Sequence, residues 1–194
     1  MRFDLLTPHQ FTNFAEYVDT LYISTFTPTP LDVAAPLAAS RLIVEEISQR
    51  VMDRFAGRAL HSPLGALPLY AGVSEPWAET LQQLYPHVFR YGFVLSDRWL
   101  TEKQIQLVTA NTQWVVMDWW QWLRARIPKT RQADAWLFLC HATHSYQAAP
   151  ERAEAGFDES IAKGMEEEGN RLMEHIASWV SQTMMNTWYQ NSSL

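Results

Sequence analysis

A ten-residue segment near the middle of the chain, WVVMDWWQWL from Trp114 to Leu123, restricts the choice of fold more than any other stretch. Six of the nine tryptophans fall between Trp99 and Trp136. Because tryptophan is the bulkiest apolar side chain and its indole N–H needs an acceptor, such a cluster either fills a large core or anchors a partner. Asp118 lies inside the cluster, where an isolated carboxylate is costly to bury. We therefore expect this segment to lie at the centre of the protein's function, whether it fills the core or anchors a partner.

Apolar residues recur at helical spacing along most of the chain, and no segment of useful length alternates as a half-buried strand does. Thr7 and Gln10 form a capping box that opens a first helix, and Thr101 and Gln104 form a second one that opens the longest. The expected helices cover residues 8–25, 32–56, 76–91, 102–127, 133–146 and 158–188.

These helices predict an all-α protein: a single domain over residues 1–194, built as an irregular bundle of five to seven helices. Its centre is a long, Trp-rich helix at about 102–127, apolar nearly all round because neighbouring helices cover it. Residues 57–76, with three Gly and three Pro among many apolar side chains, are expected to form a long loop. Residues 147–156 are expected to connect to the last helix. Apolar residues make up 47% of the chain, enough for a core without disulfides.

The chain is acidic, with a formal net charge of −6, which argues against a nucleic-acid partner. Four cations, Arg124, Arg126, Lys129 and Arg131, nevertheless surround Pro128. We interpret them as side chains that complement helix ends, with a phosphate-binding patch as the alternative. One cysteine indicates a reducing compartment. The first residues lack the apolar core of a signal peptide, and no apolar run is long enough to span a bilayer. We therefore expect a soluble, cytoplasmic protein.

A metal site is one hypothesis for the chemistry of the chain. His141 and His144 are three residues apart on one helix face, and Glu168 and His175 fall on the apolar stripe of the last helix. Imidazole and carboxylate ligands suit zinc or non-haem iron. The simpler alternative is that the histidines cap a helix end. No nucleophile elbow, phosphate-binding loop or dinucleotide-binding motif is present, so an enzyme is not favoured and no cofactor is required.

Asp118 has two interpretations of its own. On the expected helix it shares a polar line with Asn111 and Gln121, which would face solvent. If it faces inward instead, its surrounding tryptophans would raise the pKa of the carboxyl and make it a general acid.

Sparse charge and abundant aromatic residues favour a non-catalytic interaction factor, such as an adaptor, chaperone, immunity or regulatory protein, that binds a protein partner or itself. The alternatives are a metal-binding helical bundle or enzyme, and a small-molecule binder with a Trp-lined pocket. The residues expected to bind are Asp118, Trp119, Trp122, Leu64, Leu67, Leu69, Tyr70 and Trp188.

Overall fold

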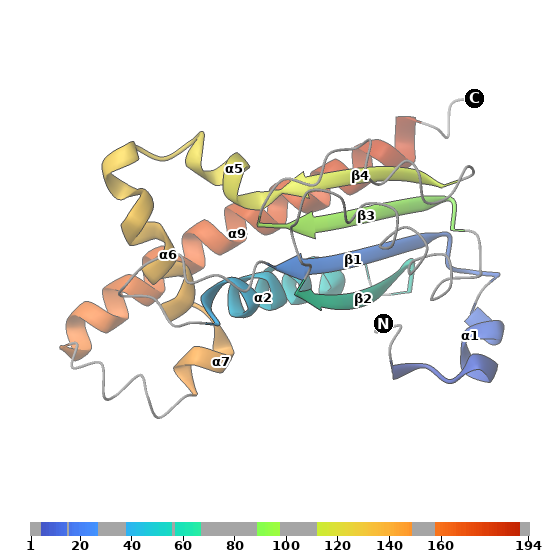
Figure 1. Ribbon diagram of the computed structural model, residues 1–194, viewed down its shortest axis with the longest axis horizontal. Coiled ribbons are helices and arrows are strands. Elements are labelled where there is room, and N and C mark those ends of the chain that lie inside the picture. The colour runs from blue at the N-terminus through green and yellow to red at the C-terminus, as the bar shows by residue number, and fades with distance from the viewer. Residues whose placement is uncertain are drawn as a thin grey trace.

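The computed structural model describes residues 5–14, 16–26, 38–55, 57–66, 89–97, 112–148 and 158–190. A four-stranded parallel sheet lies at the centre, in the order β2-β1-β3-β4 (Figure 1). Its strands are β1 (Thr20–Phe26), β2 (Ala59–Ala66), β3 (Tyr91–Ser96) and β4 (Gln113–Asp118). The prediction of an all-α helical bundle is therefore wrong, because the fold is of the mixed α/β type.

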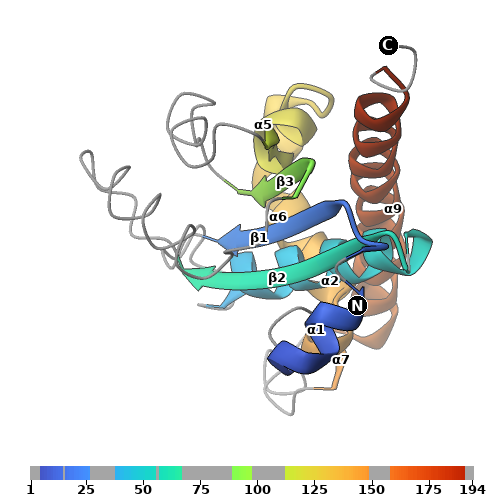
Figure 2. The same ribbon diagram turned by 90° about the vertical axis from the view of Figure 1, so that its right-hand side faces the viewer.

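Helices α2 and α9 pack against one face of the sheet, and α6 packs against both of them beyond the carboxyl ends of the strands (Figures 1 and 2). The helical elements are α1 (Pro8–Phe14), α2 (Ala39–Arg54), α5 (Trp119–Arg124), the 3-10 turn η2 (Lys129–Arg131), α6 (Gln132–His141), α7 (His144–Gln147) and α9 (Glu159–Gln190). No helix in the described segments is long and apolar enough to cross a bilayer.

The two central strands are buried on both faces. Tyr22 and Phe93 belong to the core shared with α2 and α9, whereas Leu21, Ile23 and Val94 belong to a second apolar cluster on the opposite face. A strand buried on both faces reads as a short continuous apolar run, because neither face needs polar residues. This is why the strands show no alternation, and why periodicity did not separate them from helices.

The Trp-rich segment is divided between a strand and a short helix. Residues 113–118 form β4, and the helix begins only at Trp119 and ends at Arg124. The expected long helix over 102–127 is therefore wrong; its portion at 102–111 lies outside the described residues. The β-branched pair Val115 and Val116 favours a strand. Asp118 then starts α5, because its Oδ1 accepts a hydrogen bond of 2.7 Å from the Gln121 backbone N–H.

The amino-terminal prediction is half correct. The capping box is confirmed, since the Thr7 backbone N–H donates to Gln10 Oε1 at 2.9 Å and the Gln10 N–H donates to Thr7 Oγ1 at 3.2 Å. The helix it opens ends at Phe14, however, and the last part of the expected helix, from Thr20 onward, belongs to β1. Likewise, β2 occupies the first half of the expected loop at 57–76.

The carboxyl-terminal helices match the sequence prediction best. Helix α9 begins one residue after and ends two residues after the expected 158–188. The expected helix at 133–146 is split into α6 and α7 at Thr143, whose Oγ1 accepts from the Tyr146 N–H and caps α7. Gly169 lets α9 approach α6, because a Cβ at this position would collide with the Phe138 carbonyl.

Candidate functional site

The chain leaves the sheet in opposite directions after β1 and after β3. From β1 it returns through α2 to β2, on one side of β1, whereas from β3 it goes on to β4, on the other side of β3. In open parallel sheets, ligands bind at such a switch in strand order, next to the carboxyl ends of the strands. In this protein that edge lies beside the first turn of α2 (Figure 1).

Two hydrogen-bonded pairs of polar side chains lie at this edge on the α2 side of the sheet. Ser24 Oγ of β1 lies 2.8 Å from His61 Nε2 of β2. Ser40 Oγ, in the first turn of α2, donates to Asp97 Oδ2, directly after β3. We refer to Ser24, Ser40, His61 and Asp97 as the carboxyl-edge cluster.

Three residues of the cluster are buried, with Asp97 only 2% exposed and Ser24 and Ser40 each 3% exposed, and His61 is partly buried. A carboxylate is costly to bury unless hydrogen bonds stabilise it, and the Ser40 hydroxyl supplies one. Because Ser40 lies in the first turn of a 16-residue helix, the helix dipole also favours the negative charge at this point. Two secondary-structure elements thus hold the Asp97 carboxyl group at the switch in strand order.

A second set of polar residues, Thr25, Ser96 and Asp118, lies at the carboxyl ends of β1, β3 and β4 on the opposite face. Ser96 pairs with Asp118 in the β3–β4 register, and Thr25 follows Ser24, which pairs with Leu95. Thr25 and Ser96 are buried, whereas Asp118 is half-buried at the end of β4. The carboxyl edge is therefore polar on both faces of the sheet.

The pKa of the Asp118 carboxyl is raised above its usual range. Burial is the main cause, because it removes water from the charged form, and the negative charge of Asp97 acts in the same direction. The hydrogen bond from the Gln121 N–H and the positive charge of Arg124 oppose the shift. The negative charge of Asp97 therefore acts on the Asp118 carboxyl across the edge of the sheet.

The polar groups at this edge differ in whether they donate or accept hydrogen bonds. Ionised carboxylates only accept hydrogen bonds, so Asp97 and Asp118 select ligands that carry hydroxyl or amine donors. The serine hydroxyls and the imidazole can donate or accept. The 2.8 Å contact between Ser24 and His61 is also within the distance at which an imidazole can take up a hydroxyl proton.

The four residues predicted to bind a metal do not come together. His141 is buried and packs edge-on against Tyr146, while the His144 backbone N–H donates to Glu46. Glu168 binds Arg171, and His175 is exposed on α9. Within the described segments, which contain all four, no three His, Cys, Asp or Glu side chains form a group that could hold a metal ion.

The tryptophans expected to bind a partner are mostly part of the core. Trp119 is fully buried and packs edge-on against Trp136, with ring centroids 5.0 Å apart. Trp188 is 2% exposed, and half-buried Trp122 stacks on Trp179 with centroids 5.0 Å apart.

The expected apolar loop is described only where it enters the sheet. Leu64 lies in β2, and Leu67, Leu69 and Tyr70 lie outside the described residues. The large apolar side chains that are exposed within the described part, Leu5, Tyr17, Ile161 and Tyr189, come from three separate segments. A protein partner stays a prediction from the sequence.

Sequence reasoning singled out Asp118 but missed the carboxyl-edge cluster. The signal is present, because each short apolar run ends in polar residues: Ser24 and Thr25 after LYI, Ser96 and Asp97 after YGFVL, and Asp118 after WVVM. These polar residues indicate a binding site only if the apolar runs are parallel strands, because the carboxyl ends of parallel strands meet at one edge of the sheet.

Comparison of the chain with models of protein families gave no match, and comparison with curated proteins gave none either.

Proposed function

We propose that the protein binds a small molecule with adjacent hydroxyl groups, such as a sugar or a nucleoside, at the carboxyl edge of the sheet. One observation carries the proposal: the Asp97 carboxylate is buried at the switch in strand order and held there by Ser40 of α2. A pair of ligand hydroxyls can donate to one carboxylate, and such charge-assisted hydrogen bonds are stronger than neutral ones.

The surrounding polar residues support the same ligand class. Ser24 and Ser96 lie at or near the carboxyl ends of β1 and β3, and His61, in the first half of β2, is hydrogen-bonded to Ser24. All three can donate to or accept from the other ligand atoms. The second carboxyl group, Asp118, makes this edge unfavourable for an anion and favourable for a neutral or cationic ligand.

The test is a titration of the ¹⁵N-labelled protein with adenosine, glucose and myo-inositol, followed by amide chemical shifts. We expect saturable shifts in the residues at the ends of β1, β3 and β4 with at least one probe. If adenosine binds, 2′,3′-dideoxyadenosine, which lacks the two adjacent hydroxyls of the ribose, should bind about 10- to 100-fold more weakly, the effect of losing hydrogen bonds to a charged group.

Two variants of matched charge complete the test. Asp97→Asn keeps the size of the side chain and an acceptor for Ser40, and should weaken binding by about 10-fold or more. Asp53→Asn removes the same charge from an exposed position at the far end of α2 and should leave affinity unchanged. Absence of saturable binding by all three probes, or equal affinity of Asp97→Asn and the original protein, would overturn the proposal.

A further inference from the structure

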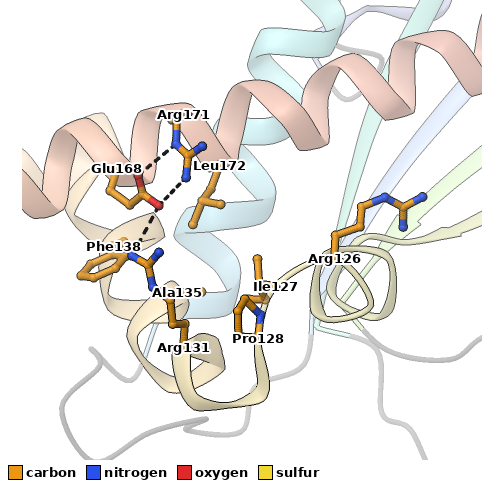
Figure 3. Close-up of a pocket in the computed structure, with 9 residues that line it drawn as sticks. All are labelled: Arg126, Ile127, Pro128, Arg131, Ala135, Phe138, Glu168, Arg171 and Leu172. Carbon is orange, nitrogen blue, oxygen red and sulfur yellow. Dashed lines mark hydrogen bonds and ion pairs between the residues drawn. The ribbon is translucent and has the colours of Figure 1, made fainter.

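A small pocket lies between the segment that joins α5 to α6 and the middle of α9 (Figure 3). Its volume is about 160 Å³, well below the roughly 300–1,000 Å³ of sites for drug-sized ligands. None of its lining residues belongs to the carboxyl-edge cluster. Ile127, Phe138 and Leu172 form its apolar wall, and Arg131, Glu168 and Arg171 line its polar part.

The polar part consists of one carboxylate between two guanidinium groups. Arg171 donates to Glu168 through two nitrogens, Nε at 2.9 Å and Nη2 at 2.6 Å, which is the bidentate geometry of a strong arginine–carboxylate pair. Arg131 Nη2 approaches Glu168 Oε1 from the other side at 3.7 Å. Figure 3 shows both arginines directed toward the same carboxylate.

Both guanidinium groups remain accessible to solvent. The side chains of Arg131 and Arg171 are 55% and 58% exposed, against 25% for Glu168. A guanidinium carries five N–H donors, so one carboxylate does not use the donors of two arginines. Two positive charges against one negative charge also leave the polar part of the pocket cationic, although the chain as a whole has a net charge of −6.

We propose that this pocket binds a small organic anion, a carboxylate or a phosphate monoester, with its charged group between Arg131 and Arg171. The short apolar part of the ligand lies against Ile127, Phe138 and Leu172. The Glu168 carboxylate already lies between the two arginines, where the charged group of the ligand would bind. It therefore competes with the ligand for Arg171, and the ligand either displaces it or binds Arg171 beside it. This site is separate from the proposed sugar or nucleoside site and does not depend on it.

The test uses butyrate, butyl phosphate and butanol as probes, each titrated into the ¹⁵N-labelled full chain. The two anions share the apolar part and differ in the charged group, so they distinguish a carboxylate site from a phosphate site. We expect at least one of them to give saturable shifts in residues 126–138 and 168–172, and the neutral alcohol to give none.

Substitutions at the polar part separate this pocket from general attraction to a cationic surface. Arg131→Gln should weaken binding of the anion by about 10-fold or more, because it removes charge-assisted hydrogen bonds. Glu168→Gln should strengthen it several-fold, since the competing charge is gone. Lys163→Gln removes one positive charge from an exposed position on the same helix as Arg171 and should change nothing beyond a small salt-sensitive effect.

Three results would overturn the proposal: shifts that rise linearly with both anions, equal shifts with butanol, or an equal loss of affinity in Lys163→Gln and Arg131→Gln. All substituted side chains are at the surface or its margin, so the folded state should persist, and circular dichroism verifies this before each titration. The opposite effects expected of Arg131→Gln and Glu168→Gln cannot both arise from loss of folding.

Discussion

At the scale of single residues, two glycines allow backbone and ring contacts that no other residue permits. Trp114 of β4 lies over Gly92 of β3, where a Cβ would collide with the indole ring. Gly169 brings α9 so close to α6 that a Cβ would collide with the Phe138 carbonyl, which is part of the backbone and cannot turn aside. Both contacts depend on the absence of a side chain rather than on conformational freedom.

Gly169→Ala is expected to destabilise the protein by about 1–3 kcal/mol, the usual effect of overpacking a close helix contact. Gly164→Ala on the same helix is the control, because no atom lies within 4 Å of the added methyl group. It should stabilise by up to about 1 kcal/mol through helix propensity alone. Urea denaturation of both variants measures the difference, and destabilisation of equal size in the two would contradict this account of α6–α9 packing.

At the scale of elements, the junction of β4 and α5 depends on one side chain with two functions. Asp118 ends the strand, caps the helix through the Gln121 N–H, and carries a carboxyl whose pKa is raised chiefly by burial. An ionised cap is favourable at a helix N-terminus, whereas burial and Asp97 disfavour the charge. The raised pKa shows that the unfavourable effects are larger.

Substitutions at Asp118 should separate its two functions. Asp118→Ala removes the cap and should cost about 1 kcal/mol, whereas Asp118→Asn keeps an acceptor for the Gln121 N–H and should cost much less. Because the folded-state pKa is raised, the folded form holds its proton more tightly, and the stability of the original protein falls as pH rises from the ordinary aspartate range through the raised value. Asp118→Asn lacks this titration.

Urea denaturation across the acidic range provides the measurement. The stability of Asp118→Asn relative to the original protein should increase with pH and then level off. A decrease over the same range would show that the carboxyl pKa is lowered in the folded state.

The elements also show how far a sequence can predict this structure. Helices α2 and α9 were predicted because each has one face exposed to water, and that face supplies the polar half of a helical pattern. Strands β1 and β3 were missed because both faces are buried, so TLYISTF and YGFVLS carry no period-two pattern. The β-branched and aromatic residues in TLYISTF were the remaining signal for a strand.

The candidate site was less predictable than the elements. Asp118 was noticed because a carboxylate inside an apolar run is conspicuous. Ser24, Ser40, His61 and Asp97 are far apart in the sequence, and only the parallel arrangement of β1, β2 and β3 brings them together. A site of this kind cannot be assembled before the strand order is known.

At the scale of the whole molecule, Trp188 connects the last helix to the sheet. Its Nε1 donates to Thr20 Oγ1 at 3.1 Å, its ring packs edge-on against Phe55 and Phe93, and the Arg58 guanidinium lies 4.1 Å from the ring centroid. We expected this residue to bind a partner, whereas its side chain is buried in the core. Trp188 thus connects α9 with β1, with β3 and with the turn between α2 and β2.

Trp188→Ala should therefore destabilise the protein by about 3–5 kcal/mol, the range for removing a large buried aromatic side chain. Its neighbour Tyr189 is 66% exposed, and Tyr189→Ala should change stability by no more than about 0.5 kcal/mol. Thermal denaturation followed by circular dichroism compares the two variants. Similar small losses in both would place Trp188 outside the core.

The contact between Trp188 and Thr20 also has a consequence for how the chain reaches this fold. It joins residues 168 positions apart, and the parallel strands contain no pair that a tight turn could connect. A contact between residues so distant in sequence requires a long loop to close, and the entropy cost of closing it comes before the contact can stabilise the fold. This slows folding. During synthesis, β1 can pair with β2 early, but it meets α9 only after residue 188 has emerged from the ribosome. Until then the apolar face of the nascent sheet is open to other chains, so the chain is most prone to aggregation in this interval.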